Sequence, residues 1–186
     1  MTMKTATVLM TLMLGLAACK EKVAVTTTTP AAPAATTPAA PDNSVPALTS
    51  QGYGSVRFGQ TLSDVEQALG EKAQSRGESD PACTYVKFDK LPGARFMVET
   101  GVITRAEADA GIPNELGVAV GDTVEQAKAK YPAVQVGPHK YVPDGNYLTF
   151  KKVDSNNAIV MEAEGSKITR IRSGIEPAVS YVEGCQ

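Results

Sequence analysis

The chain has 186 residues, a formal net charge of −2 and no tryptophan. This weakly acidic balance gives no electrostatic reason to expect nucleic acid or an anionic membrane surface as a partner, because binding to phosphate groups depends on an excess of Lys and Arg. Aromatic residues make up 5% of the sequence, so we expect a core built mainly of aliphatic side chains.

The first 18 residues have the pattern of a secretory signal peptide. Lys4 supplies a positive start, and residues 5–18 form an uncharged, mostly apolar run that ends in small side chains. A helix needs roughly 20 apolar residues to cross a bilayer, so this run is too short for a comfortable permanent span. We predict that residues 1–18 are removed, which changes the net charge to −3 because Lys4 is lost.

The end of this segment, Leu16-Ala17-Ala18-Cys19, resembles the lipobox of bacterial lipoproteins. In that family a peptidase cuts before the cysteine, whose thiol carries a diacylglycerol and whose amine is acylated. The resemblance implies that Cys19 is lipidated, and each buried methylene of its chains would contribute about 0.8 kcal/mol to anchoring. By the same resemblance, Lys20 in place of an aspartate implies the outer membrane, with the protein facing the periplasm. An ordinary signal peptide followed by a coincidental cysteine is the alternative.

Residues 19–50 are predicted to be a lipid-anchored linker. Pro, Ala and Thr dominate this stretch without any apolar periodicity. Such a composition cannot bury enough surface to offset its ordering entropy, and its prolines favour an extended chain. At about 3.1 Å per residue, a tether of this length reaches up to roughly 90 Å.

Three cysteines are present, namely Cys19, Cys83 and Cys185. If Cys19 is acylated, two remain, and an oxidising envelope favours a disulfide between Cys83 and Cys185. The alternative, a metal pair, is disfavoured because no cysteines have CxxC spacing and His139 is the only histidine. We therefore predict a disulfide, no metal site and no cofactor.

The remaining sequence contains an internal repeat. Residues 56–65 align with residues 118–127 at a shift of 62, and the same shift places Tyr85-Val86-Lys87-Phe88 over Tyr147-Leu148-Thr149-Phe150. Ile103-Thr104-Arg105 matches Ile168-Thr169-Arg170 at a shift of 65. Self-similarity of this kind indicates repeated structural units. We predict two repeats, covering residues 51–114 and 115–186.

Each repeat is predicted to form one helix followed by strands. Thr61 and Thr123 are suited to cap helix starts with their hydroxyl groups, and Gly70 and Pro132 are suited to end these helices. The predicted strands cover residues 85–88, 95–99, 102–107, 147–151, 159–163 and 167–172. The sequence therefore predicts an α+β fold of two tandem repeats, each a helix packed on a short antiparallel sheet. Units of about 65 residues are small, so we expect the two to pack side by side.

The spacing of Gly59, Thr61, Val65, Leu69 and Gly70, followed by antiparallel strands, resembles the SmpA/OmlA group of outer-membrane lipoproteins. The tandem duplication with a late cysteine also resembles β-lactamase inhibitory protein. These resemblances imply a binding role, either in support of outer-membrane protein assembly or in inhibition of an enzyme. This chain departs from the first group by having two repeats and from the inhibitor by its predicted anchor. The resemblances therefore say more about its fold than about its binding partner.

The candidate binding surface is the sheet face opposite the helices, because side chains alternate along a strand. Tyr and Arg are enriched at interface hot spots. The residues predicted to contact a partner are Tyr85, Lys87, Arg105, His139, Tyr141, Tyr147, Arg170 and Arg172. The alternative is that these are solvated side chains of an amphipathic sheet. We interpret the carboxylates Glu107 and Glu162 as solvated groups at strand edges.

The sequence gives little indication of a catalytic site. His139 is the only histidine available for a triad or dyad, and no nucleophile motif surrounds it. Our hypothesis is therefore a non-enzymatic, outer-membrane-anchored periplasmic lipoprotein that binds an unidentified envelope protein. The alternatives are an inhibitor of a periplasmic enzyme of the lysozyme or β-lactamase type, an enzyme that uses His139, and a passive envelope spacer.

Overall fold

The structure is a computed structural model that describes residues 45–75, 80 and 82–185. The predicted signal peptide, the predicted lipidation site Cys19 and most of the predicted linker lie outside the described residues. Among the residues that are described, no helix combines the length and apolarity needed to cross a membrane.

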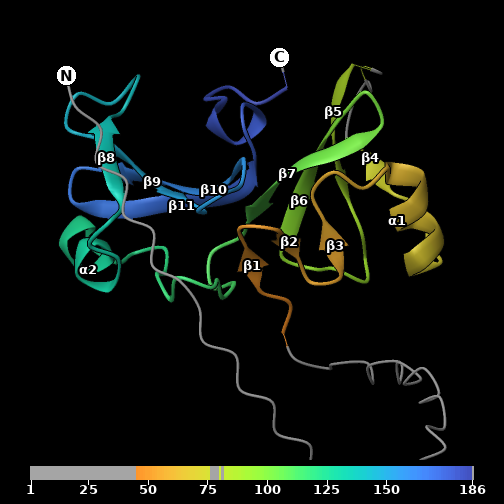
Figure 1. Cartoon of the computed structure of the whole chain (residues 1–186), viewed down its shortest axis with the longest axis horizontal. Coiled ribbons are helices and arrows are strands. Elements are labelled where there is room, and N and C mark those ends of the chain that lie inside the picture. The colour runs from red at the N-terminus through yellow and green to blue at the C-terminus, as the bar shows by residue number, and fades with distance from the viewer. Residues whose placement is uncertain (1–44, 76–79, 81, 186) are drawn as a thin grey trace, which may run out of the picture. The chain divides into compact units, whose positions relative to one another are not determined.

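A small three-stranded sheet opens the described part of the chain (Figure 1). Its strands are β1 (Leu48–Thr49), β2 (Gly52–Tyr53) and β3 (Val56–Arg57), paired antiparallel in chain order. Leu48, Tyr53 and Val56 are fully buried. The Tyr53 hydroxyl donates a hydrogen bond to the Pro92 carbonyl over 2.5 Å, which fastens this sheet to the main body.

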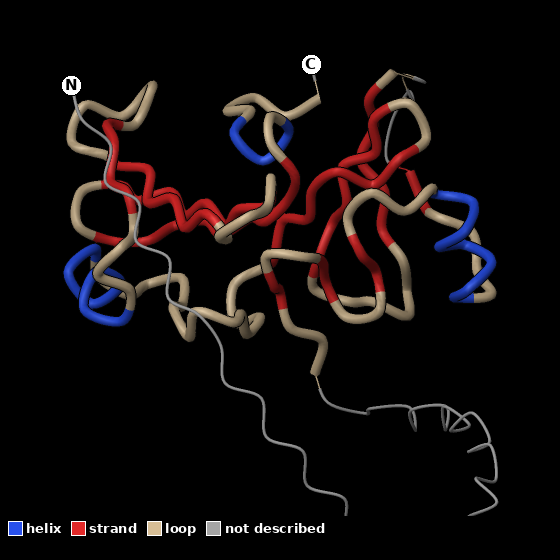
Figure 2. The backbone as a smooth tube through the Cα atoms, viewed as in Figure 1, coloured by secondary structure: helices blue, strands red, loops and turns tan. Residues whose placement is uncertain are grey.

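The main body is one eight-stranded antiparallel sheet (Figures 1 and 2). Its strands are β4 (Gln74–Ser75), β5 (Cys83–Lys87), β6 (Ala94–Glu99), β7 (Val102–Ala108), β8 (Gln135–Pro138), β9 (Asn146–Lys151), β10 (Asn157–Glu164) and β11 (Lys167–Ile175). Their spatial order is β4-β5-β6-β7-β11-β10-β9-β8, so β7 and β11 meet at the centre.

Two short α-helices and one 3-10 helix accompany the sheets in the described part of the chain. They are α1 (Leu62–Leu69), α2 (Val124–Lys130) and η1 (Ala178–Ser180). The predicted helix starts are confirmed, because the side chain of Thr61 accepts from the Asp64 N–H and that of Thr123 accepts from the Gln126 N–H. Gly70 ends α1 in the left-handed conformation, with a φ of 65°.

The predicted α+β fold of two helix-on-sheet repeats is wrong. The described protein is mostly β, and a single sheet runs through both halves because β7 pairs with β11 from Ile171↔Ala108 to Gly174↔Arg105. Gly174 permits this close approach, since a Cβ there would lie 2.5 Å from the Thr104 carbonyl oxygen. The helices are too short to form a layer over such a sheet, and each buries one residue, Val65 in α1 and Ala127 in α2.

The core lies on one face of the eight-stranded sheet, the face that α1 and α2 contact. Phe96, Ile103, Leu148 and Ile159 have no exposed surface and belong to one continuous apolar cluster with the small sheet. The rings of Phe88 and Phe96 meet edge to face, with centroids 5.7 Å apart. The other face of the sheet is therefore left for polar side chains and for the C-terminal segment.

Two β-bulges determine which side chains reach that other face. One interrupts the pairing of β6 with β7 and the other the pairing of β10 with β11. Strict alternation would place Ile103 and Arg105 on the same face, and likewise Ile168 and Arg170. The bulges let Ile103 and Ile168 enter the core while both arginines point to the opposite side.

The predicted disulfide is confirmed. Cys83, at the start of β5, is bonded to Cys185 across 102 positions of sequence, with the two Cα atoms 5.3 Å apart. After β11 the chain crosses the polar face of the sheet (Figure 2). The disulfide fixes the end of this segment beside β5.

Replacing both cysteines, as Cys83→Ser and Cys185→Ser, should lower the free energy of unfolding by about 2–4 kcal/mol, because a closed loop of about 100 residues restricts the unfolded chain. Urea denaturation of the full chain measures this. A reducing agent should destabilise the unmodified chain by a similar amount and leave the double variant unchanged. Equal stability of the two proteins would contradict the expectation.

Candidate functional site

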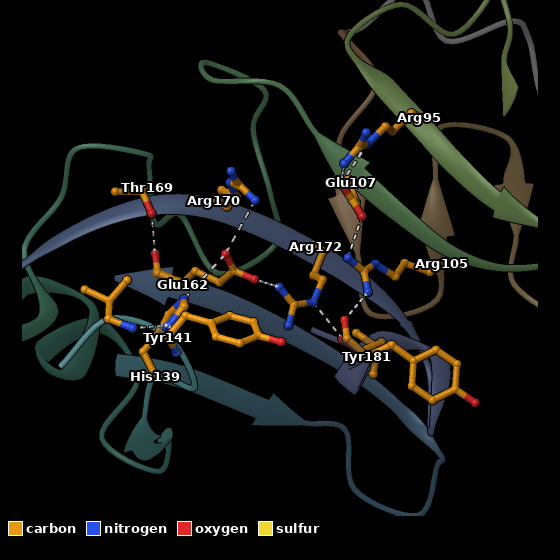
Figure 3. A network of polar contacts seen from close by, with 12 residues as sticks. Arg95, Arg105, Glu107, His139, Tyr141, Glu162, Thr169, Arg170, Arg172 and Tyr181 are labelled. Carbon is orange, nitrogen blue, oxygen red and sulfur yellow. Dashed lines mark hydrogen bonds and ion pairs between the residues drawn. The ribbon is translucent and has the colours of Figure 1, made fainter. Parts of the chain in front are cut away.

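Polar side chains from five strands converge on the face of the sheet opposite α1 and α2, around the junction of β7 and β11 (Figure 3). They surround a cavity of about 570 Å³, which we call the arginine pocket. Its lining residues are Tyr85, Arg95, Arg105, Glu107, Ala108, Asp109, Glu162, Arg170, Ile171, Arg172, Val182, Glu183 and Cys185. Because β7 ends at Ala108 and β11 begins only at Lys167, the pairing of these two strands is what assembles this pocket.

Two buried arginines hold the C-terminal segment on this face. Arg105 donates from Nη1 to the carbonyl oxygens of Ala178, over 3.3 Å, and Tyr181, over 2.6 Å. Arg172 donates from Nε to the Val179 carbonyl oxygen over 2.7 Å. The exposed fractions of Arg105 and Arg172 are 4% and 3%. Their guanidinium groups therefore bind the protein's own main chain and form the floor of the pocket.

Glu107 is the anionic centre of one half of the pocket. It accepts from the Tyr85 hydroxyl over 2.8 Å and from Arg95 Nε over 2.7 Å, and it forms an ion pair with Arg105. Burial by itself would raise the pKa of Glu107, but the charge of Arg105, the Tyr85 hydrogen bond and the contact with Arg95 outweigh it and lower that pKa below 4.5. The carboxylate is therefore ionised wherever the protein is folded near neutral pH.

The same cluster determines the protonation state and the position of Tyr85. Burial, and then the negative charge of Glu107, raise the pKa of Tyr85 to about 12. Its hydroxyl group therefore stays protonated and donates to Glu107. The guanidinium group of Arg95 lies over the ring, 4.5 Å from its centroid, in a cation–π contact that fixes the ring's position.

Glu162 is the anionic centre of the other half. It forms an ion pair through Oε1 with Arg172, while its Oε2 lies 3.9 Å from Arg170 Nη1 and 4.0 Å from His139 Nε2. Burial and the neighbouring charge of Arg105 lower the pKa of Arg172, and the Glu162 carboxylate counteracts them. Arg170 differs from the other three, because 74% of its side chain is exposed. It is the most exposed of the four arginines that line the pocket.

His139 is bound on its δ nitrogen. Nδ1 accepts from the N–H groups of Tyr141 and Val142, over 3.1 and 3.2 Å. The neutral ring therefore carries its proton on Nε2, which faces Glu162. The ring also stacks on Tyr147, with centroids 4.5 Å apart. A histidine held in this way has no free lone pair with which to accept a proton from a substrate.

Of the eight residues predicted to contact a partner, Tyr85, Arg105, Arg170 and Arg172 line the pocket. His139 adjoins it through Glu162, and Tyr147 lies beneath the guanidinium of Arg172, 5.7 Å from the ring centroid. Tyr141 and Lys87 lie at the periphery, Tyr141 bonded to Glu183 and Lys87 beside a second hollow of about 370 Å³. The sequence thus predicted which side chains share this face.

The interpretation of Glu107 and Glu162 as solvated carboxylates is wrong. Glu162 has an exposed fraction of 7%, and both side chains are ion-paired to buried arginines. Arg95 was not predicted as a site residue either. The available signal was charge alternation, since Arg105 and Glu107 are two apart on one strand and therefore share a face. Among the described residues, no group of three or more His, Cys, Asp or Glu side chains is arranged to hold a metal ion.

Glu107→Gln should lower the free energy of unfolding at pH 7 by about 3 kcal/mol, because it leaves the buried guanidinium of Arg105 without its counter-charge. The folded-state pKa of Glu107 is lowered, so its stabilisation is present above pH 4.5 and is lost as the pH falls through the folded pKa. The difference between the two proteins should therefore shrink in acid. Urea denaturation at pH 7 and pH 4 measures this.

Glu125→Gln, which removes an exposed carboxylate on α2, is the matched control and should change stability by less than about 0.5 kcal/mol. If Glu107→Gln is as stable as the unmodified chain at pH 7, the buried guanidinium of Arg105 does not depend on Glu107 as its counter-charge.

Comparison with known proteins assigns no family. No family model matches the chain, and no curated protein matches it. Among solved structures, the chain is similar to the uncharacterized protein YfeY from Escherichia coli, with a TM-score of 0.44 and 14% sequence identity, over 69% of this chain and 99% of that one. A similarity of this degree supports no functional assignment. The resemblance to the SmpA/OmlA group therefore stays a prediction from the sequence.

Proposed function

We propose that this chain is an outer-membrane-anchored lipoprotein whose folded part binds another envelope protein, in the periplasm and without catalysing a reaction. The anchoring part of this proposal depends on the signal-like segment of residues 1–18, on Cys19 and on the Thr/Pro/Ala-rich stretch that follows. A disulfide between the remaining cysteines is consistent with an oxidising compartment outside the cytoplasm.

The observation that carries the binding proposal is Arg170. Its side chain is 74% exposed, whereas Arg105 and Arg172 are paired and buried, and Arg95, which is 48% exposed, is engaged by Glu107. Tyr141 and Tyr181, exposed by 61% and 39%, belong to the same face, since Tyr141 bonds Glu183 of the pocket and the Tyr181 carbonyl binds Arg105. Exposed tyrosines and an exposed arginine around a hollow are the side chains and the shape that protein interfaces favour.

The rigidity of this surface also favours binding. Its floor is set by strand pairing, and its C-terminal wall is held by the arginine–carbonyl hydrogen bonds and the disulfide. A surface that is already in its binding conformation loses less conformational entropy when a partner docks. The bonding of His139 supports a binder over an enzyme that uses this residue, because its Nδ1 is occupied and its Nε2 faces a carboxylate.

Placing a photo-crosslinking amino acid at position 170 of the full chain should yield a discrete covalent adduct with one envelope protein in living cells, because this position lies at the centre of the proposed interface. Gel mobility and mass spectrometry identify the adduct. The same amino acid at position 128, on α2 and against the opposite face, should give none. Adducts of equal yield at both positions, or at neither, would contradict the proposed surface.

The anchor is tested by the intact mass of the mature protein. We expect a polypeptide that begins at Cys19 and carries the added mass of a diacylglycerol and an acyl chain. Cys19→Ala should leave the chain unprocessed and without lipid. A mature protein with a bare thiol at Cys19, or one that retains earlier residues, would refute the lipoprotein assignment and leave the binding surface untouched.

A further inference from the structure

Within the arginine pocket, the carboxylates of Glu107 and Glu183 accept hydrogen bonds from neighbouring side chains, whereas the guanidinium of Arg170 is not engaged in this way. Both carboxylate oxygens of Glu107 accept from neighbours, and the Glu183 carboxylate is taken by Lys140 and Tyr141. In contrast, the guanidinium of Arg170 makes no hydrogen bond with any described residue, and its nearest ionic contact is at 3.9 Å. A pocket with spare donors fits a ligand that supplies acceptors.

The charge of the lining points in the same direction. Four arginines line the pocket, and the acidic residues that face them are Glu107, Asp109 and Glu162, since Glu183 is neutralised by Lys140. One positive charge is left over. Burial and the nearby charge of Arg105 lower the pKa of Arg172, and Arg105 Nε is buried without a partner among the described residues. A single negative charge in the pocket would offset this repulsion.

We propose that the arginine pocket binds the carboxylate of an acidic residue of the protein partner, with Arg170 as its principal ligand and Arg172 beneath it. The two arginines are two residues apart on β11 and face the same side, about 7 Å apart along the strand. The planar fork of Arg170 matches a carboxylate with two parallel hydrogen bonds. This inference rests on the proposed function and names the chemistry of the partner at that site.

A carboxylate fits this site better than a phosphate group. The protein already holds two carboxylates here, Glu107 and Glu162, each shared between arginines. A phosphate monoester carries close to two negative charges at neutral pH, and the excess of the lining is one positive charge. The second charge would meet the carboxylates of Glu162 and Asp109 without compensation.

The test uses the full chain, purified in detergent, and two matched probes: the α-amide of N-acetylglutamic acid and the neutral α-amide of N-acetylglutamine. NMR signals of the arginine Nε–H groups are followed during titration at constant ionic strength. We expect saturable shifts with the glutamate probe and none with the glutamine probe. Arg170→Gln should weaken binding of the glutamate probe at least tenfold, and this variant should fold normally because the Arg170 side chain is largely exposed.

Lys128→Gln, which removes an exposed positive charge on α2, is the control and should change the affinity less than twofold. Equal shifts with both probes, or equal weakening by the two substitutions, would overturn the proposal. So would tighter binding of inorganic phosphate than of the glutamate probe, which would assign the site to a phosphoryl group. If the adduct at position 170 forms while the glutamate probe fails to bind, the binding function stands and the carboxylate chemistry falls.

Discussion

The antiparallel pairing of β7 with β11 brings together the groups on which the polar face depends. It joins two four-stranded halves into one sheet and places Arg105 and Arg172 next to each other under the C-terminal segment. Two like charges in a buried position are costly, so the arrangement requires Glu107 and Glu162 as counter-charges. The strand pairing, the ion pairs and the path of the chain end therefore depend on one another.

Buried ion pairs are weak sources of net stability, because desolvation of the charges offsets most of their attraction. Their value here is geometric. Each guanidinium binds both the main chain of the C-terminal segment and a carboxylate, which is on the same strand for Arg105 and on the neighbouring strand for Arg172. The disulfide from Cys83 to Cys185 secures the far end of the same segment. The result is a hollow with defined walls on a sheet face that would otherwise be flat and solvated.

The proposed role follows from what this hollow leaves unoccupied. Arg105 and Arg172 are engaged within the protein, whereas Arg170 and the rim tyrosines Tyr141 and Tyr181 face solvent. Under the proposal, a long Thr/Pro/Ala-rich tether lets such a surface search the space beneath the outer membrane for its partner. The energy of binding would then be concentrated at a few side chains near the pocket mouth, and the buried pairs would supply the rigidity.

The sequence by itself determined the local features of this protein. Threonine caps, turn residues and alternating apolar positions predicted both helix starts, most of the strands and several of the side chains that share the polar face. Once Cys19 was assigned to the lipid anchor, two cysteines remained, and this count was enough to predict the disulfide. These predictions succeed because each depends on residues a few positions apart, or on composition alone.

Only the tertiary structure decided that the halves form one sheet, that Glu107 and the buried Glu162 are counter-ions of buried arginines and that the chain end covers these arginines. The single sheet depends on the pairing of β7 with β11, and the hydrogen bonds of Arg105 to the chain end join residues more than 70 positions apart, so the packing of the whole chain decides both. The missing Cβ of Gly174 permits the close approach of β7 and β11, and two β-bulges determine which side chains face the arginine pocket. The sequence contains Gly174 and the bulged residues, but their effect on the polar face arises only when the strands pair.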